Sequence, residues 1–481
     1  MSAELDALVV GAGPNGLSAA IRLARAGREV LLVEAERTVG GGCRSAELTL
    51  PGVVHDVCAS VMPLGAGSPF LRTLPLEAHG LDWVQPPVPA AHPLDDGSAV
   101  LLRRSVEETA VDLGDDARSY RRLVGPLVRR WEALAHASLG PASHSLGHPL
   151  VMARLGVPGV LSARLLARSA FGGERARALL AGMAAHSILP LERPFTAAFG
   201  LVLGASGHAE GWPFARGGAG RLAEALASYL TSIGGRIETE RPIEAARDLP
   251  PARVTIFDLD PGQVARIAGD RLPEVYRRRL RRFRHGPGAF KLDLAIDGPI
   301  PWSAPELRLA GTVHLGGTLE EIAAGESAVA RGDHPPRPFV LLAQSSLFDE
   351  TRAPDGVHTV WAYCHVPAGS TVDMTDRIEA QVERFAPGFR DRILARHAFA
   401  PADYARYNRN YVGGDIAGGA HDGLQLFARP APRIAPYATP APDLFIGSAS
   451  TPPGGGVHGM SGYHAAGLAL RRLEATSRSG R

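Results

Sequence analysis

The first fifty residues alternate between short apolar runs and a helical pattern. The apolar run at 7–10 predicts a buried strand, residues 17–26 have helical spacing, and the run at 30–33 predicts a second strand. Strand, helix and strand in this order are typical of a parallel βαβ unit. The pattern therefore predicts an α/β fold that begins with such a unit.

Glycines with the spacing G-x-G-x-x-G follow the first predicted strand. Gly11 permits a tight turn, Gly13 lets the backbone approach a pyrophosphate, and Gly16 lets helix and strand pack closely. Pro14 and Asn15 lie between them, where the helix N-terminus offers unpaired N–H groups and a positive dipole end to phosphates. The sequence therefore predicts a Rossmann-type dinucleotide site at this turn.

An acidic residue ends the second predicted strand. Glu34 stands 18 residues after Gly16, near the position of the acid that accepts the ribose hydroxyls of a dinucleotide, and Ala35 follows it. NAD and FAD share this fingerprint, so these positions do not separate the two cofactors.

A second glycine cluster separates them. Arg37, Gly41, Gly42 and Arg44 resemble the R-x-x-G-G-x-x-R pattern of flavoproteins of the amine oxidase and phytoene desaturase superfamily. In that superfamily the glycines let the backbone lie against the diphosphate and the flavin, and the arginines neutralise phosphate charge. The alternative is a flexible surface loop. The resemblance implies FAD as the cofactor.

Two later segments extend the resemblance. A predicted strand at 236–240 leads to Ile243, whose backbone is expected at the adenine. Near the C-terminus a strand at 444–446 precedes a glycine-rich loop and a helix at 464–475. By resemblance, the flavin contacts from this end of the chain are Gly447, Gly456, Val457 and Met460.

The closest form of the pattern is the phytoene desaturase-like branch. It implies a Rossmann-type FAD domain built from three segments, interrupted by a mixed α/β substrate domain. The expected FAD-binding ranges are 1–67, 212–285 and 430–481, and the expected substrate ranges are 68–211 and 286–429. The resemblance also implies a small apolar substrate and an electron acceptor that is O₂ or a quinone.

Two residues are candidates for catalysis. Lys291 is the only lysine among 51 Lys and Arg residues, which suggests a position that needs a compact ammonium group. Amine oxidase relatives have a lysine linked through water to flavin N5 at this place. The alternative is a lysine whose stem covers apolar surface. His458 is a candidate acid or base near the flavin, or else a structural histidine.

Composition excludes some classes of function. A net charge of +2 favours neither nucleic acid nor an acidic partner. The arginines at 277–284 lie on a predicted amphipathic helix, so no nucleic acid is expected. The cysteines form no C-x-x-C pair, so no metal site is expected.

The expected location is cytoplasmic. No signal-peptide pattern opens the sequence, and no apolar run reaches spanning length. The apolar, arginine-bearing stretch at 150–171 allows a peripheral membrane contact or simple packing on a neighbouring element.

Three functions stay open at this point. The first is hydride transfer at C–C bonds of an apolar, isoprenoid-like substrate, giving desaturation, saturation or isomerisation. The second is a flavin amine oxidase that oxidises a C–N bond with O₂. The third is a flavin-binding regulatory protein without turnover.

Overall fold

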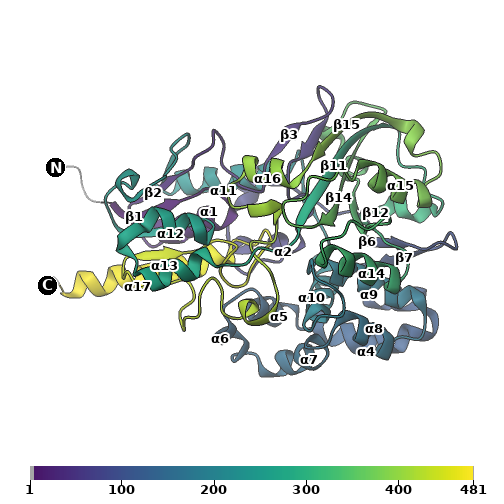
Figure 1. Ribbon diagram of the computed structural model, residues 1–481, viewed down its shortest axis with the longest axis horizontal. Helices are drawn as coiled ribbons and strands as arrows, with labels where there is room; N and C mark the ends of the chain where they lie inside the picture. Colours follow the sequence, from purple (N-terminus) through teal and green to yellow (C-terminus); the bar gives the residue numbers. More distant parts are fainter. Residues whose placement is uncertain (1–4, 480–481) are drawn as a thin grey trace.

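A parallel sheet at one end of the molecule gathers strands from distant parts of the chain (Figure 1). The computed structural model describes residues 5–479. The strands of this sheet, in spatial order, are β16 (Leu444–Ile446), β10 (Ala252–Phe257), β1 (Leu5–Val10), β2 (Val30–Val33) and β9 (Arg236–Glu238). Every pair in it is parallel, as the opening βαβ pattern predicts.

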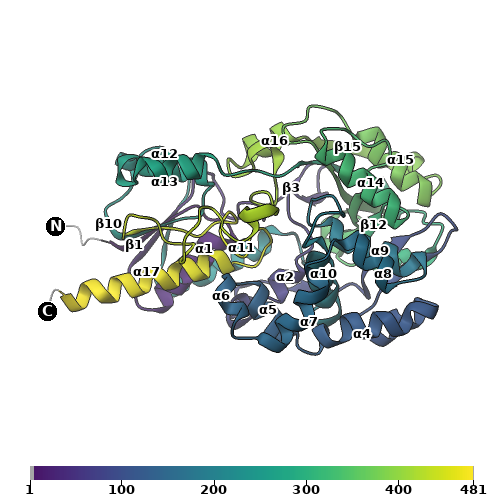
Figure 2. The ribbon, with the colours of Figure 1, turned by 60° about the horizontal axis from the view of Figure 1, so that its bottom comes forward.

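Helices cover both faces of this sheet (Figure 2). Ala7 and Val9 of β1 belong to the core on one face, whereas Leu8 and Val10 belong to the core on the other. A parallel sheet buried on both faces requires such uninterrupted apolar strands. The helices on the first face are α1 (Pro14–Arg25), α11 (Gly220–Ser232) and α17 (Met460–Ser479). The helices on the second face are α12 (Pro261–Ala268) and α13 (Glu274–Arg281).

The glycine turn after β1 is packed without spare space. A Cβ on Gly16 would lie 1.9 Å from the carbonyl oxygen of Gly11, so helix and turn meet as closely as the fingerprint predicts. The Gly16 N–H donates to Asp258 Oδ2 at 2.9 Å. Because Asp258 directly follows β10, this bond joins α1 to the neighbouring strand.

A second, mixed sheet lies beside the first (Figure 1). Its strands, in spatial order, are β15 (Ile393–Phe399), β11 (Gly288–Asp297), β14 (Val357–Val366), β13 (Val340–Ala343), β12 (Ala310–Leu315), β6 (Val88–Pro93) and β7 (Ala99–Leu102). Only β12 and β6 pair in parallel among the described strands of this sheet. The helices that accompany it in sequence are α14 (Leu319–Ala330), α15 (Thr375–Phe385) and α16 (Pro401–Tyr407).

A helical region follows β7 and packs below this second sheet in Figure 1. Its helices are α3 (Val106–Asp112), α4 (Ala117–Val128), α5 (Trp131–Ser138), α6 (Ala142–Ser145), α7 (Pro149–Gly159), α8 (Ala163–Ala170), α9 (Glu174–Ala185) and α10 (Thr196–Ala209). No single helix within residues 5–479 meets the length and apolarity needed to cross a membrane. The pair α7 and α8 meets that test only together, across a bend of 93°.

Smaller elements connect these parts. They are β3 (Ser45–Glu47) paired with β4 (Val54–Asp56), α2 (Pro63–Ala66), and β5 (Trp83–Val84) paired with β8 (Phe214–Ala215). The last helix begins at Met460, four residues before the expected start, and β9 ends two residues before the expected Glu240. The expected domain boundaries stay a prediction, and residues 1–4 and 480–481 of those ranges lie outside the described residues.

The arginine-rich helix α13 is amphipathic as expected. Tyr276 and Leu280 are buried in the core against the sheet. On the other side Arg277 pairs with Asp270 and Glu274, and Arg281 pairs with Glu274. Its positive charge is therefore partly neutralised by carboxylates of its own surroundings.

The contact between α1 and α17 gives a first prediction. A Cβ on Gly462 would lie 1.8 Å from the Asn15 carbonyl oxygen, a backbone atom that cannot move aside cheaply. We expect Gly462→Ala to lower the free energy of unfolding by about 3 kcal/mol or more, through overpacking. Gly156→Ala in α7, where a Cβ meets nothing within 4 Å, is the matched control and should raise stability by roughly 0.5–1 kcal/mol. Denaturant unfolding of both variants measures this, and equal stabilities would contradict it.

Candidate cofactor and substrate cavity

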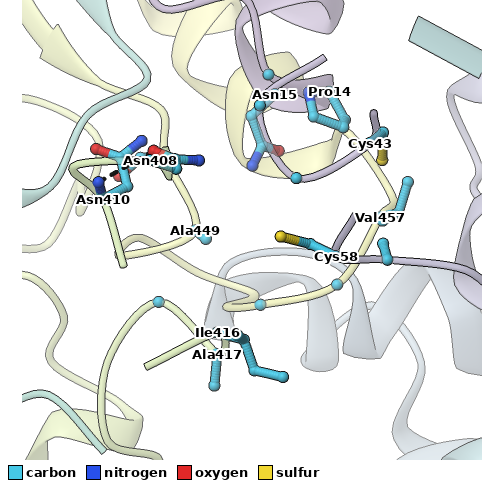
Figure 3. A pocket seen from close by; sticks show the side chains of 18 of the residues that line it. Pro14, Asn15, Cys43, Cys58, Asn408, Asn410, Ile416, Ala417, Ala449 and Val457 are labelled. Atoms are coloured by element: carbon cyan, nitrogen blue, oxygen red, sulfur yellow. Dashed lines mark hydrogen bonds between the residues drawn. The ribbon is translucent and has the colours of Figure 1, made fainter. Parts of the chain in front are cut away.

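One cavity of about 580 Å³ is lined by both sheets, the helical region and the C-terminal loop. Its volume lies in the range usual for small-molecule sites. Figure 3 shows Pro14 and Asn15 from the glycine turn facing Ile416, Ala417 and Val457 across this space.

Most of the predicted cofactor contacts lie on the cavity wall. They are Gly11, Gly13, Pro14, Asn15, Glu34, Ala35, Gly41, Gly42, Arg44, Ile243, Gly456 and Val457. The fold therefore brings the three expected segments of the fingerprint to one place, and the individual contacts with a cofactor stay predictions.

The glycines in the loops at this end bring backbone close to the cavity. A Cβ on Gly41 would lie 3.1 Å from Gly13 Cα, and a Cβ on Gly13 would lie 2.7 Å from Asp258 Oδ2. Asn15 Oδ1 is buried on this wall and has no hydrogen-bond partner within the described chain. A glycine cradle with an orphaned polar atom at a helix N-terminus fits a dinucleotide.

Glu34 is held firmly at the end of β2. Its Oε2 accepts a hydrogen bond from the Ala12 N–H at 2.7 Å, and its Oε1 accepts one from the Glu36 N–H at 3.0 Å. Arg44 Nη2 lies 3.7 Å from Oε1. The carboxylate is thus fixed toward the cavity, as an acceptor for ribose hydroxyls must be.

A second carboxyl group lies at the end of β10. The pKa of Asp258 is raised to about 7, mainly by burial and also by the Glu34 charge, while the hydrogen bond from Gly16 opposes the rise. Asp258 and Glu34 both line the cavity. The end of the sheet is therefore acidic near the expected ribose, and its net charge changes close to neutral pH.

Four predicted contacts do not lie on this wall. Arg37 is exposed, and Gly16 serves the packing of α1. Gly447 supports α17, because its Cβ would lie 2.9 Å from Ala465 Cβ. Met460 is buried at the start of α17 and lines a different cavity. Gly16 therefore packs helix against turn as the fingerprint predicts, whereas Arg37, Gly447 and Met460 lie away from the wall where cofactor contacts were expected.

Lys291 also does not lie on the cavity wall. Its side chain is fully buried on β11 and forms an ion pair with Asp293. His55 Nδ1 and His397 Nδ1 lie 3.6 and 3.7 Å from the two oxygens of Asp293. Two residues connect Lys291 to the cavity wall: Tyr363, its cross-strand neighbour on β14, and Cys58, whose pKa burial raises to about 12 while the Lys291 charge opposes that rise. Lys291 is therefore placed to influence a group bound in the cavity through neighbouring residues and not by direct contact with that group.

His458 is on the wall and fully buried. Its Nδ1 accepts a hydrogen bond from the Met460 N–H at 3.0 Å, and its Nε2 has no partner within the described residues. Burial lowers the pKa of His458 to about 4. At neutral pH the ring is uncharged, with one nitrogen free toward a bound group.

Sequence reasoning missed the segment at 404–418. Tyr404, Tyr407 and Tyr411 line the cavity together with Asn408 and Asn410. Tyr407 donates a hydrogen bond to the Gly41 carbonyl at 3.0 Å, and the Asn410 side chain donates one to the Asp258 carbonyl at 3.2 Å. The glycine pairs at 413–414 and 418–419, inside this segment and at its end, were the available signal, but their distance in sequence from the fingerprint hid the contact.

The other end of the cavity is apolar. Its wall is formed by Met62, Leu64, Leu139, Leu155, Ile188, Ala198, Phe199, Val202, Leu203, Leu341, Trp361 and Ile416. These residues come mainly from α5, α7 and α10 and from β13 and β14. The helical region that interrupts the fingerprint therefore supplies most of the apolar wall.

Comparison with known proteins agrees with this arrangement. Residues 9–74 match the model of the NAD(P)-binding Rossmann-like domain. Pyridine nucleotide-disulfide oxidoreductase domain-containing protein 2 of Rattus norvegicus is 27% identical, over 98% of this chain and 94% of that protein. Hydroxyneurosporene desaturase of Cereibacter sphaeroides is 28% identical, over 98% of both chains.

Solved structures share the fold. Putrescine oxidase bound to putrescine superposes with a TM-score of 0.61 and 16% identity, over 98% of this chain and 99% of that one. An oxidoreductase from Methanosarcina mazei gives a TM-score of 0.63 and 16% identity, over 98% and 100%. The chain is therefore an oxidoreductase with a dinucleotide-binding Rossmann domain, homologous to pyridine nucleotide-disulfide oxidoreductase domain-containing protein 2 and to the phytoene and hydroxyneurosporene desaturases.

Proposed function

We propose that this protein binds FAD and transfers hydride to or from C–C bonds of a small apolar substrate. The observation that carries the proposal is one cavity with two kinds of wall, glycine-rich and polar at the fingerprint and apolar at the helical region. FAD bound at the polar wall would be the two-electron carrier for a substrate at the apolar wall.

Support for FAD over a nicotinamide cofactor comes from the second half of the fingerprint. Gly41, Gly42 and Arg44 lie on the wall beyond the ribose acid, and Gly456 and Val457 reach the same space from the opposite end of the chain. A flavin extends a dinucleotide site into these loops. Their backbone N–H groups can stabilise negative charge on a reduced ring.

Support for an apolar substrate comes from the charges of the cavity. The acidic and basic residues on the wall belong to the dinucleotide end, among them Glu34, Arg44 and Asp258. At the other end the titratable side chains include His186 and His421, and burial lowers the pKa of each to about 3. Within the described lining, that end offers no carboxylate to hold an alkylammonium ion. Two relatives are named for hydroxyneurosporene and phytoene, which agrees with a largely apolar substrate.

One observation favours the alternative of an amine oxidase. Trp361, Tyr363, Tyr404, Tyr407 and Tyr411 all line the cavity, which gives it more aromatic surface than the sequence pattern predicts. The fold shared with putrescine oxidase is compatible with that reading. An amine would have to bind uncharged at the apolar end. An open, lined cavity gives no support to a regulatory protein without turnover.

The electron acceptor and the location belong to the same proposal. O₂ or a quinone would reoxidise the flavin. The apolar wall continues through Leu155 of α7 to Leu150 and Val157, which are 65% and 75% exposed on the outside of that helix. A cytoplasmic protein with this helix at a membrane surface could exchange apolar molecules there.

The apolar end gives a direct test of the reaction. Anaerobic addition of a polyene such as phytoene should bleach the flavin absorption band, whereas primary amines such as putrescine should not. Val202→Trp should leave the flavin spectrum intact but stop bleaching, because the indole fills the apolar end. Val202→Ala is the control, because it leaves the apolar end of the cavity open and should still allow bleaching. Bleaching by amines alone would replace the proposal with the amine oxidase.

The ribose acid gives a test of the cofactor. Glu34→Ala removes an acceptor that two backbone N–H groups already fix. We expect FAD affinity to fall about tenfold or more, since charged hydrogen bonds contribute roughly 1.5–3 kcal/mol. Flavin content after gel filtration measures this, and Glu77→Ala at an exposed site is the matched control. Full flavin occupancy in Glu34→Ala would contradict the assignment.

Lys291 requires a design that separates catalysis from stability. Lys291→Met leaves Asp293 buried without its partner, so we expect a loss of roughly 3–5 kcal/mol in unfolding free energy. Lys291→Met combined with Asp293→Asn should recover much of it. In that double variant we expect photoreduced flavin to reoxidise more slowly in air than in wild type, because the ammonium group is absent. Unchanged reoxidation would limit Lys291 to a structural role.

A further inference from the structure

A second cavity, of about 800 Å³, lies outside the site described above. It is lined by α1, α17, α5, the segment around α6 and the loops at 69–73 and 434–437. The charged, polar or aromatic side chains on its wall are Arg22, Arg25, Phe70, Thr73, His136, Ser143, His144, Tyr437, Tyr463, His464 and Arg471. It therefore lies where helices of the dinucleotide-binding sheet meet the helical region.

This cavity carries unbalanced positive charge. Arg22, Arg25 and Arg471 line it, and no aspartate or glutamate does so within the described residues. None of the three arginines has an ion pair in the described part of the chain. Burial lowers the pKa of Arg22, and the charge of Arg471 lowers it further. An anion between these guanidinium groups would remove that repulsion.

Arg22 is held in one orientation before any ligand binds. Its Nη1 donates to the Tyr463 carbonyl at 2.6 Å, and its guanidinium carbon lies 3.7 Å from the centre of the Tyr463 ring. Gly467 makes room for it, because a Cβ there would lie 2.7 Å from Nη1. A fixed, planar guanidinium with remaining N–H donors is suited to oxyanions.

Two polar atoms of this wall are buried without partners. Tyr437 is 3% exposed, and its hydroxyl has no hydrogen-bond partner within the described residues. His464 Nε2 is likewise a buried atom without a hydrogen-bond partner within the described residues. The His464 ring stacks against the Tyr437 ring, with the ring centroids 5.7 Å apart. Buried polar atoms are normally paired, so unpaired ones on a cavity wall point to a ligand.

Flat rings surround these groups. Phe70 and Tyr463 lie 4.7 Å apart, and His136 stacks on His144 at 4.6 Å with an interplanar angle of 7°. Burial lowers the pKa of His136, so its ring favours the neutral form that stacks well. At this spacing the two rings of each pair are already in contact, so a planar ligand ring would lie against the outer face of a pair and not between its members.

We propose that this second cavity binds a phosphate monoester that carries a planar ring. The phosphate would lie on Arg22, Arg25 and Arg471, with the Tyr437 hydroxyl and His464 as further partners. The ring would lie among the aromatic and imidazole faces. Because α1 and α17 also shape the dinucleotide end of the first cavity, the ligand would stabilise the packing beneath it.

The test uses full-length protein saturated with FAD, so that the first cavity is filled. Isothermal titration at low salt with AMP should show saturable binding. Adenosine, which lacks the phosphate, should bind with an affinity at least about tenfold lower. Arg471→Gln should weaken AMP binding about tenfold. Arg472→Gln, the adjacent exposed arginine of the same helix, is the matched control and should leave it unchanged.

Three results would overturn the proposal. They are the absence of saturable AMP binding, equal weakening by Arg471→Gln and Arg472→Gln, and release of flavin on AMP addition, which would assign the binding to the first cavity. Tyr437→Phe adds an independent readout, since it removes an unpaired buried hydroxyl. Without AMP its melting temperature should equal or exceed that of wild type, whereas the rise caused by AMP should be smaller. An unchanged rise in both Tyr437→Phe and Arg471→Gln would also contradict the proposal.

Discussion

The close contact of α1 with the turn before it and with α17 is the constraint on which the site depends. Gly16 lies against the Gly11 carbonyl, and Gly462 lies against the Asn15 carbonyl, with no room for a side chain at either glycine. These contacts fix the N-terminus of α1, and with it the N–H groups offered to the cofactor. They also bring the last helix of the chain to the first turn, so the C-terminal loop at 454–458 completes the same cavity.

The chain's arrangement separates the two tasks of the cavity. The parallel sheet and its glycine turns supply a polar cradle, and the helical region that interrupts the fingerprint supplies an apolar wall. Buried histidines of the cavity wall, such as His186 at the apolar end and His458 in the C-terminal loop, favour the neutral form because burial lowers their pKa. The cavity thus keeps its charges beside the expected cofactor, while uncharged groups surround the expected substrate.

The position of Lys291 shows how burial changes the role that can be inferred for a residue. As the only lysine of the sequence it suggested a position that needs a compact ammonium group, which the resemblance linked to flavin N5 through water. In the fold its ammonium is buried with Asp293 and His55 behind the wall, and the partly exposed His397 borders this polar cluster. Any effect on the cofactor must pass through groups such as Cys58, which does line the cavity.

The sequence by itself determined the dinucleotide end of this protein. Gly11, Gly13 and Glu34 lie within one local βαβ unit, where spacing along the chain translates directly into geometry. Tertiary structure alone decided the rest. Tyr407 bonds to Gly41 and Asn410 bonds to Asp258 across 366 and 152 residues of sequence, and no local periodicity predicts such contacts. The same holds for the second cavity, because α1, α5 and α17 are far apart in sequence and meet there only in the folded chain.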